Sequence, residues 1–149
     1  MSLLRVTLPK PKEFWWTTVA GEPQPKERPR VVGRHAFTPK RTVDAQDDMA
    51  WAVKAAHPRL KCDGDSEFGL RCVFYCTPSN RRQSNAMPDA DNLGKLIRDG
   101  LQGTAWKNDS QVREDFYIVL PAHLHAPHSE ILFYKLTPEY LRERDLEET

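Results

Sequence analysis

The spacing of hydrophobic residues predicts two amphipathic helices. In residues 42–56, apolar side chains recur at three- and four-residue intervals, which places them on one helical face. We expect Thr42 to cap the start of this helix, because a threonine oxygen can accept from an unpaired backbone amide. A second helix is predicted over residues 91–102, and Gly103 is expected to end it. The residues of its core stripe are Leu93, Leu96, Ile97 and Leu101.

Alternating apolar and polar residues predict the strands. The predicted strands cover residues 14–20, 67–77, 111–120 and 130–136, with a short turn and strand over 31–38. The strands at 111–120 and 130–136 are close enough along the chain to pair antiparallel, and residues from 138 onward are expected to form a short amphipathic or frayed tail. The order of elements favours an α/β (α+β) two-layer sandwich with a mixed β-sheet and two main helices.

Length and composition narrow the class of protein. A chain of 149 residues is expected to form a single domain, residues 1–149. No apolar run approaches the roughly 20 residues of a membrane helix, and no signal peptide is visible, so we expect a cytoplasmic protein without a membrane partner. The three cysteines, an odd number, argue against a disulfide framework. A net charge of +1 excludes a protein that coats nucleic acid through its overall charge.

Positive charge is nevertheless concentrated at the N-terminus. Residues 1–41 hold nine Lys/Arg and three Glu, a sum of +6, whereas the tail at 137–149 holds two bases and five acids, a sum of −3. The sequence therefore suggests a basic N-terminal arm beside a more acidic second half. The candidate contacts to phosphate groups are Lys26, Arg28, Arg30, Arg81, Arg82 and Lys107. Their alternative interpretation is ordinary exposed surface charge.

The most informative stretch is Pro88-Asp89-Ala90-Asp91-Asn92-Leu93-Gly94-Lys95. In extended backbone, Asp89 and Asp91 project to the same side, and Asp91 is expected at the N-cap of the second helix. Lys95 lies four residues later on the same helical face. Two neighbouring carboxylates repel each other unless a cation intervenes, and Mg²⁺ prefers oxygen ligands. The same spacing also fits a capped helix with a solvated polar face.

A second acidic block, Asn108-Asp109-Ser110, precedes the strand at 111–120. These residue types are typical of a simple turn. Alternatively, the block brings a third carboxylate, that of Asp109, to the same site as Asp89 and Asp91.

Together these blocks resemble the RusA family of Holliday junction resolvases. The resemblance rests on Pro88-Asp89-x-Asp91-Asn92-x-x-Lys95, Asp99-Gly100-Leu101 and Asp109-Ser110-Gln111-Val112, and it spans about residues 14–136. The segments Pro25-Lys26-Glu27-Arg28-Pro29-Arg30 and Phe37-Thr38-Pro39 look like phage-type members.

The resemblance implies a homodimeric, Mg²⁺-dependent endonuclease that cuts four-way DNA junctions symmetrically in recombination and repair. The family's essential carboxylates match Asp89, Asp91 and Asp109, which would hold the metal, and its essential lysine matches Lys95. Mn²⁺ would be a possible substitute, and the setting would be the cytoplasm of a bacterium, with a bacterial or phage gene. Asn108 departs from the family, which often has an acid there.

Two alternatives remain open at this point. One is a structure-selective DNA-binding module with a weakened metal site, motivated by Asn108. The other is a metal-dependent glycosyltransferase with a D-x-D motif, which leaves the block at Asp109 unexplained. Three histidines, His123, His125 and His128, are expected to be loop residues rather than zinc ligands, because no cysteine or acid completes the set.

Overall fold

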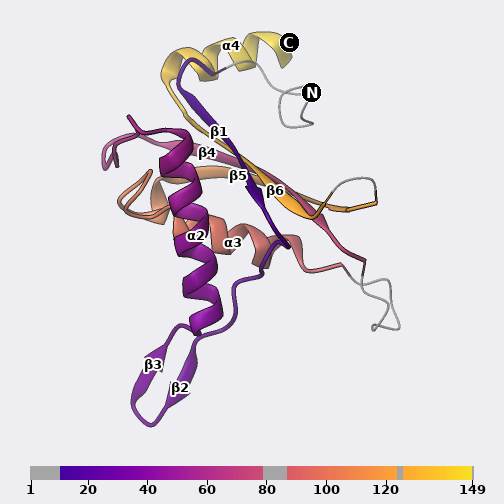
Figure 1. The fold of residues 1–149 in the computed structure, drawn as a ribbon. Coiled ribbons are helices and arrows are strands. Elements are labelled where there is room, and N and C mark those ends of the chain that lie inside the picture. Colours follow the sequence, from indigo (N-terminus) through magenta and orange to yellow (C-terminus); the bar gives the residue numbers. More distant parts are fainter. Residues whose placement is uncertain (1–10, 79–86, 124–125, 149) are drawn as a thin grey trace.

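The computed structural model describes residues 11–78, 87–123 and 126–148. Its centre is a four-stranded sheet in the order β1-β6-β4-β5, in which the last strand of the chain, β6, lies between β1 and β4 (Figure 1). The strands are β1 (Phe14–Ala20), β4 (Phe68–Cys76), β5 (Val112–Pro121) and β6 (His128–Lys135). β6 is antiparallel to β1 and β4, whereas β4 and β5 are parallel. The expected mixed sheet is therefore confirmed.

The expected antiparallel pairing of the two last strands is wrong, because β4 lies between β5 and β6. The burial of β4 explains this position. Seven of its nine residues are buried, with only Arg71 and Tyr75 half-buried, as expected for a strand with neighbours on both edges and cover on both faces. β5 is mostly exposed or half-buried and forms an edge of the sheet.

Two helices cover one face of the sheet, α2 (Lys40–Ala56) and α3 (Ala90–Gly100) (Figure 1). Met49 and Val53 of α2 join Leu93 and Ile97 of α3 in one buried cluster with side chains from β4 and β6. Both predicted helices thus exist. The predicted stripe of the second helix is fully buried, whereas in the first helix only Met49 and Val53 of the predicted apolar face are buried. The fold is therefore α+β. At this face a layer of two helices packs on the sheet, as the order of elements predicted.

The start of α2 differs from the prediction. The helix begins after Pro39, and Thr42 is buried within its first turn. The Thr42 hydroxyl instead accepts a hydrogen bond from the backbone amide of Glu27 (3.1 Å), so it fastens the N-terminal segment to the helix. Pro39 serves as the boundary because its fixed φ suits a helix start.

A short hairpin precedes α2. Its strands β2 (Arg30–Val32) and β3 (His35–Phe37) pair antiparallel, and the hairpin extends away from the sheet (Figure 1). Gly33 at the turn has a φ of +62°, which glycine adopts without strain. The prediction of one short strand here thus becomes two strands.

The second face of the sheet carries a smaller apolar cluster. Tyr140 of α4 (Pro138–Glu148) packs there with Val73, Leu132 and Tyr134. The residues predicted as a tail therefore form a docked helix. No helix among the described residues is long and apolar enough to span a bilayer.

Candidate active site

The acidic stretch lies at the N-terminus of α3. Asp89 has extended backbone (φ −64°, ψ 123°), and its Oδ1 accepts a hydrogen bond from the Asp91 amide at 2.9 Å. The N-cap is therefore Asp89 rather than Asp91, and Asp91 lies in the first helical turn. Both carboxylates consequently lie at the end of the helix where the backbone amides favour negative charge.

Asp91 and Lys95 form the predicted contact on one helical face. Lys95 Nζ lies 3.0 Å from Asp91 Oδ2, and the two side chains are 54% and 64% exposed. An exposed pair of this kind contributes at most about 1 kcal/mol to stability. Both groups are therefore open to solvent, and either of them can leave this ion pair to bind a ligand at little cost in free energy.

Asp109 begins a single 3₁₀ turn, η1 (Asp109–Gln111). Asn108 caps this turn, because its Oδ1 accepts from the Ser110 amide at 2.9 Å. Gln111 completes the cap, since its Oε1 accepts from the Asn108 amide at 3.0 Å. Asn108, which departs from the family pattern, thus has a structural task that an amide oxygen performs without charge.

Gln111 also joins two loops. Its Nε2 donates to the carbonyls of Asp63 (2.8 Å) and Ser66 (2.9 Å), in the loop between α2 and β4. The Asp63 amide in turn donates to the Ala105 carbonyl at 3.0 Å. The loop that carries Asp109 is therefore held against the loop at 63–66 from both sides.

Arg98 holds the same loop from α3. Its Nη2 donates to the carbonyls of Asp109 (3.0 Å) and Val112 (3.2 Å), and its Nη1 lies 3.0 Å from Asp115 Oδ2. The Tyr117 hydroxyl donates to the same carboxylate at 3.1 Å. The sequence reasoning missed this role of Arg98, because a basic residue one turn after Lys95 looks like part of the solvated face.

The N-terminal segment crosses the start of α3. The Lys26 amide donates to the Asn92 carbonyl at 3.0 Å, and Lys26 Nζ is paired with Asp99. Arg28 and Arg30 are exposed, as is Lys107. Among the candidate DNA contacts, Lys26 therefore has a partner within the protein, and Arg81 and Arg82 lie outside the described residues.

A cavity of about 460 Å³ adjoins Asp89. The N-terminal segment contributes Glu22 and Glu27 to its lining, and α2 contributes Arg41. Glu22 is held in place, because its carboxylate accepts from the amide and the hydroxyl of Thr77, each at 2.9 Å. Arg41, counted only as part of the basic arm in the sequence, therefore lines the same cavity as Asp89.

The donor chemistry of this site fits a hard divalent cation. Asp89 and Asp91 offer exposed carboxylate oxygens, and Mg²⁺ is commonly bound by one or two carboxylates together with waters and substrate phosphates. Within the described parts of the chain, no three His, Cys, Asp or Glu side chains form a group that would enclose a metal ion on their own. Asp109 therefore forms no such group with Asp89 and Asp91 in this structure, and the carboxylates that it brings together are those of Asp89 and Asp91 at the start of α3.

A comparison with known protein families identifies a match. The profile of one protein family, described as "Endodeoxyribonuclease RusA", matches residues 20–119. The match includes the sheet strands β4 and most of β5, both covering helices and every residue of the acidic blocks. A comparison with curated proteins finds no match. Because the profile covers well over half of the chain, this protein belongs to the RusA endodeoxyribonuclease family.

Proposed function

We propose that the protein is a Mg²⁺-dependent, structure-selective endonuclease that resolves four-way DNA junctions in recombination and repair. Membership in the RusA family implies a Holliday junction-resolving endonuclease, and the cofactor and the site residues are our own addition. The observation that carries this addition is the exposed pair Asp89 and Asp91 at the start of α3, with Lys95 one turn further on.

Asp89, Asp91 and Asp109 are the residues that would hold the ion. Bound Mg²⁺, or Mn²⁺ in its place, would supply charge stabilisation at the phosphoryl oxygens and activation of a water. Asp89 and Asp91 are fixed relative to each other by the N-cap hydrogen bond at 2.9 Å. Asp109 is fixed through its own carbonyl by Arg98. An ion would therefore compete with the N-cap hydrogen bond at Asp89 Oδ1 and with Lys95 at Asp91 Oδ2.

Lys95 is proposed to contact the scissile phosphate. Its ammonium group lies 3.0 Å from Asp91 Oδ2, near the start of α3. As water adds to phosphorus and the bond to the leaving oxygen breaks, negative charge grows on the phosphoryl oxygens. A fixed ammonium group beside those oxygens stabilises this charge more than it stabilises the substrate.

A homodimer is proposed because a four-way junction has two-fold symmetry, and a two-fold dimer presents two equal sites to it. Light scattering of the purified protein tests this part of the proposal. We also propose a bacterial or phage origin and a cytoplasmic setting, where a nuclease of this kind meets recombining DNA.

The deciding experiment is cleavage of a synthetic mobile four-way junction with Mg²⁺. Paired nicks at symmetric positions in opposing strands, lost when EDTA is added, are expected. A linear duplex of the same sequence is the control substrate and is expected to stay intact. Cleavage of neither substrate, or equal cleavage of both, would contradict the proposal.

A DNA-binding module without cleavage is the second candidate, and Asn108 is the observation that favours it. An amide replaces a carboxylate next to Asp109 there, which lowers the negative charge available to a cation. Tight junction binding without nicks at any Mg²⁺ or Mn²⁺ concentration would establish this candidate. The family match gives no support to the glycosyltransferase alternative.

A further inference from the structure

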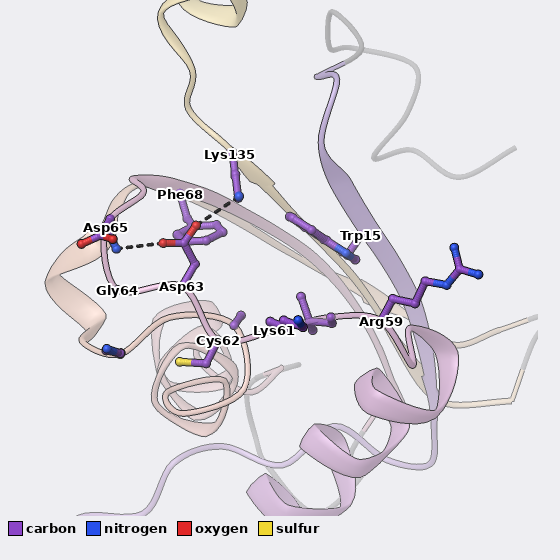
Figure 2. A pocket seen from close by; sticks show the side chains of 12 residues that line it. Trp15, Arg59, Lys61, Cys62, Asp63, Gly64, Asp65, Phe68 and Lys135 are labelled. Atoms are coloured by element: carbon purple, nitrogen blue, oxygen red, sulfur yellow. Dashed lines mark hydrogen bonds and ion pairs between the residues drawn. The ribbon is translucent and has the colours of Figure 1, made fainter.

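A second cavity, of about 430 Å³, lies between the loop that follows α2 and the loop that follows α3. Basic side chains line it from three segments, with Arg59 and Lys61 on the first loop, Lys107 on the second and Lys135 on β6. Trp15 forms one wall beside Lys61, and Arg59 extends outward beyond Trp15 at the rim (Figure 2).

Two acidic side chains line this cavity, and one of them, Asp63, already has hydrogen-bond partners within the protein. Asp63 accepts from the Ser66 hydroxyl at 2.6 Å and from the Asp65 amide at 2.8 Å, and Lys135 Nζ lies 3.1 Å away. These hydrogen bonds, that of Ser66 first, hold the pKa of Asp63 well below its usual range. Asp63 is therefore a fixed anion whose charge Lys135 offsets, as Figure 2 shows.

The remaining cations have no such partner. Arg59, Lys61 and Lys107 are exposed, and none of them forms an ion pair with any residue within the described ranges. Asp65 is the acid left to face them at the cavity. Four basic and two acidic side chains give this cavity a local charge of +2, which favours an anionic ligand.

The cavity is also rigidly joined to the loop of Asp109. Gln111 binds both sides, since it accepts from the Lys107 amide at 2.9 Å and donates to the Asp63 carbonyl at 2.8 Å. The aliphatic stem of Lys107 lies directly over Gly64, where an added Cβ would be 2.6 Å from its Cδ. The loop of Asp109 and the lining of this cavity are therefore linked through Gln111 and Lys107.

We propose that this cavity binds the phosphodiester backbone of a DNA arm, with Arg59 and Lys61 as phosphate contacts that act together with Lys107. The inference rests on the proposed function, because it takes DNA as the ligand. It adds two contacts outside the N-terminal arm, on a loop whose sequence shows no motif. Such contacts position the DNA relative to Asp109 without reading its sequence.

The test measures binding of a fluorescein-labelled four-way junction in EDTA, so that no cleavage occurs, over about 50 to 200 mM salt. The double variant Arg59→Ala/Lys61→Ala is expected to bind about tenfold more weakly, with a slope of log K against log salt shallower by about one to two. Arg142→Ala, which removes an exposed cation on α4, is the matched control and is expected to keep the wild-type slope. The charge-conserving swap Arg59→Lys/Lys61→Arg is expected to restore binding, and circular dichroism checks that each variant is folded. If the alanine double variant fails to fold, Lys61→Gln replaces it, with about half the change in slope expected.

Three outcomes separate the possibilities. A double variant with wild-type affinity and slope overturns this inference, while junction cleavage by the wild type keeps the proposed function. A wild type that binds no junction overturns both. Inorganic phosphate is the probe for a free anion. If millimolar phosphate raises the melting temperature of the wild type but not of the double variant, and DNA affinity is equal in both, the cavity is a small-anion site and the inference is overturned.

Discussion

Arg98 Nη2 donates a hydrogen bond to the backbone carbonyl of Asp109 at 3.0 Å. The same guanidinium reaches the carboxylate of Asp115, also at 3.0 Å. One side chain of α3 thus fixes the loop that carries a proposed metal ligand and the edge strand that follows it. We therefore infer that Arg98 is a positioning residue, which would act on the proposed reaction through Asp109.

Replacement of Arg98 by lysine is expected to lower both stability and cleavage. Lysine keeps the charge but not the forked geometry, so the carbonyls of Asp109 and Val112 lose donors, at a cost of about 2 kcal/mol. Urea unfolding measures the loss, and single-turnover cleavage is expected to slow while the junction Kd changes less than about twofold. Arg113→Lys is the matched control, because Arg113 makes an exposed pair with Glu67 at 3.4 Å that contributes about 1 kcal/mol or less. An Arg98→Lys protein that cleaves at the wild-type rate would contradict the positioning role.

Charge-removing substitutions at the acidic blocks are expected to separate binding from cleavage. Asp89→Asn and Asp109→Asn should abolish nicking but leave junction binding intact or slightly tighter, because they remove negative charge that faces the phosphates. Lys95→Ala should slow cleavage and also weaken binding modestly. Gel-shift assays in EDTA and nicking assays in Mg²⁺ measure the two properties on the same preparations. Retained nicking in either aspartate variant removes that residue from the ligand set.

Gln111→Ala is expected to loosen the two loops that it joins. The substitution leaves the carbonyls of Asp63 and Ser66 without a donor and the Lys107 amide without an acceptor, at a cost of roughly 2 kcal/mol in unfolding free energy. Gln46→Ala removes a single, longer contact to the Leu96 carbonyl (3.4 Å), so it serves as the control and should cost less than about 1 kcal/mol. Equal losses of unfolding free energy in the two variants would contradict the role of Gln111 in joining the two loops.

Gly94→Ala is expected to disturb the packing of α3 on β5. An added Cβ would lie 2.2 Å from the ring of Tyr117, so the ring or the helix must move, at a cost of about 1–3 kcal/mol. Since Tyr117 also donates to Asp115, the shift should reach Arg98 and slow cleavage. In Gly100→Ala the obstacle is the flexible end of Met49, so this control should cost little. Thermal melts of both variants measure the difference.

The pH dependence of stability should reveal Asp63. Its folded-state pKa lies below the ordinary value, so the folded form binds its proton more weakly than the unfolded chain. The stabilisation is complete above about pH 5 and is lost as the pH falls below about 4. Asp63→Asn should therefore be about 1 kcal/mol less stable than the wild type at pH 7, and the gap should shrink toward pH 3. Asp65→Asn, at an exposed neighbour, is the control in the same measurements.

The helices and most strands were predictable because each has a clear period of apolar residues. The strand order was harder, since β5 and β6 are close in sequence and look like a hairpin. β5 and β6 are separated because β4 is buried and needs a neighbouring strand on each edge. A strand buried on both faces, with Cys72, Val73 and Phe74 in succession, carries that signal in its own sequence.

The candidate site was predictable as a set of residue types but not as a set of contacts. Aspartate is a common N-cap residue, so the pattern alone could not show whether Asp89 or Asp91 caps α3. The roles of Arg98, Arg41 and Gln111 depend on partners far along the chain, such as Asp63 and Asp115. Long polar side chains give no periodic signal, so their partners appear only in three dimensions.

The central place of β6 has a consequence for the synthesis of the chain. β1 pairs with β6 and with no other strand of the sheet, and Trp15 is opposite Phe133. The first strand must therefore wait, unpaired, until the ribosome has released nearly all of the described chain. A nascent chain that already exposes its basic arm and acidic blocks thus lacks the sheet that fixes them. We expect a nuclease built in this order to acquire its cutting activity only after β6 has been synthesised.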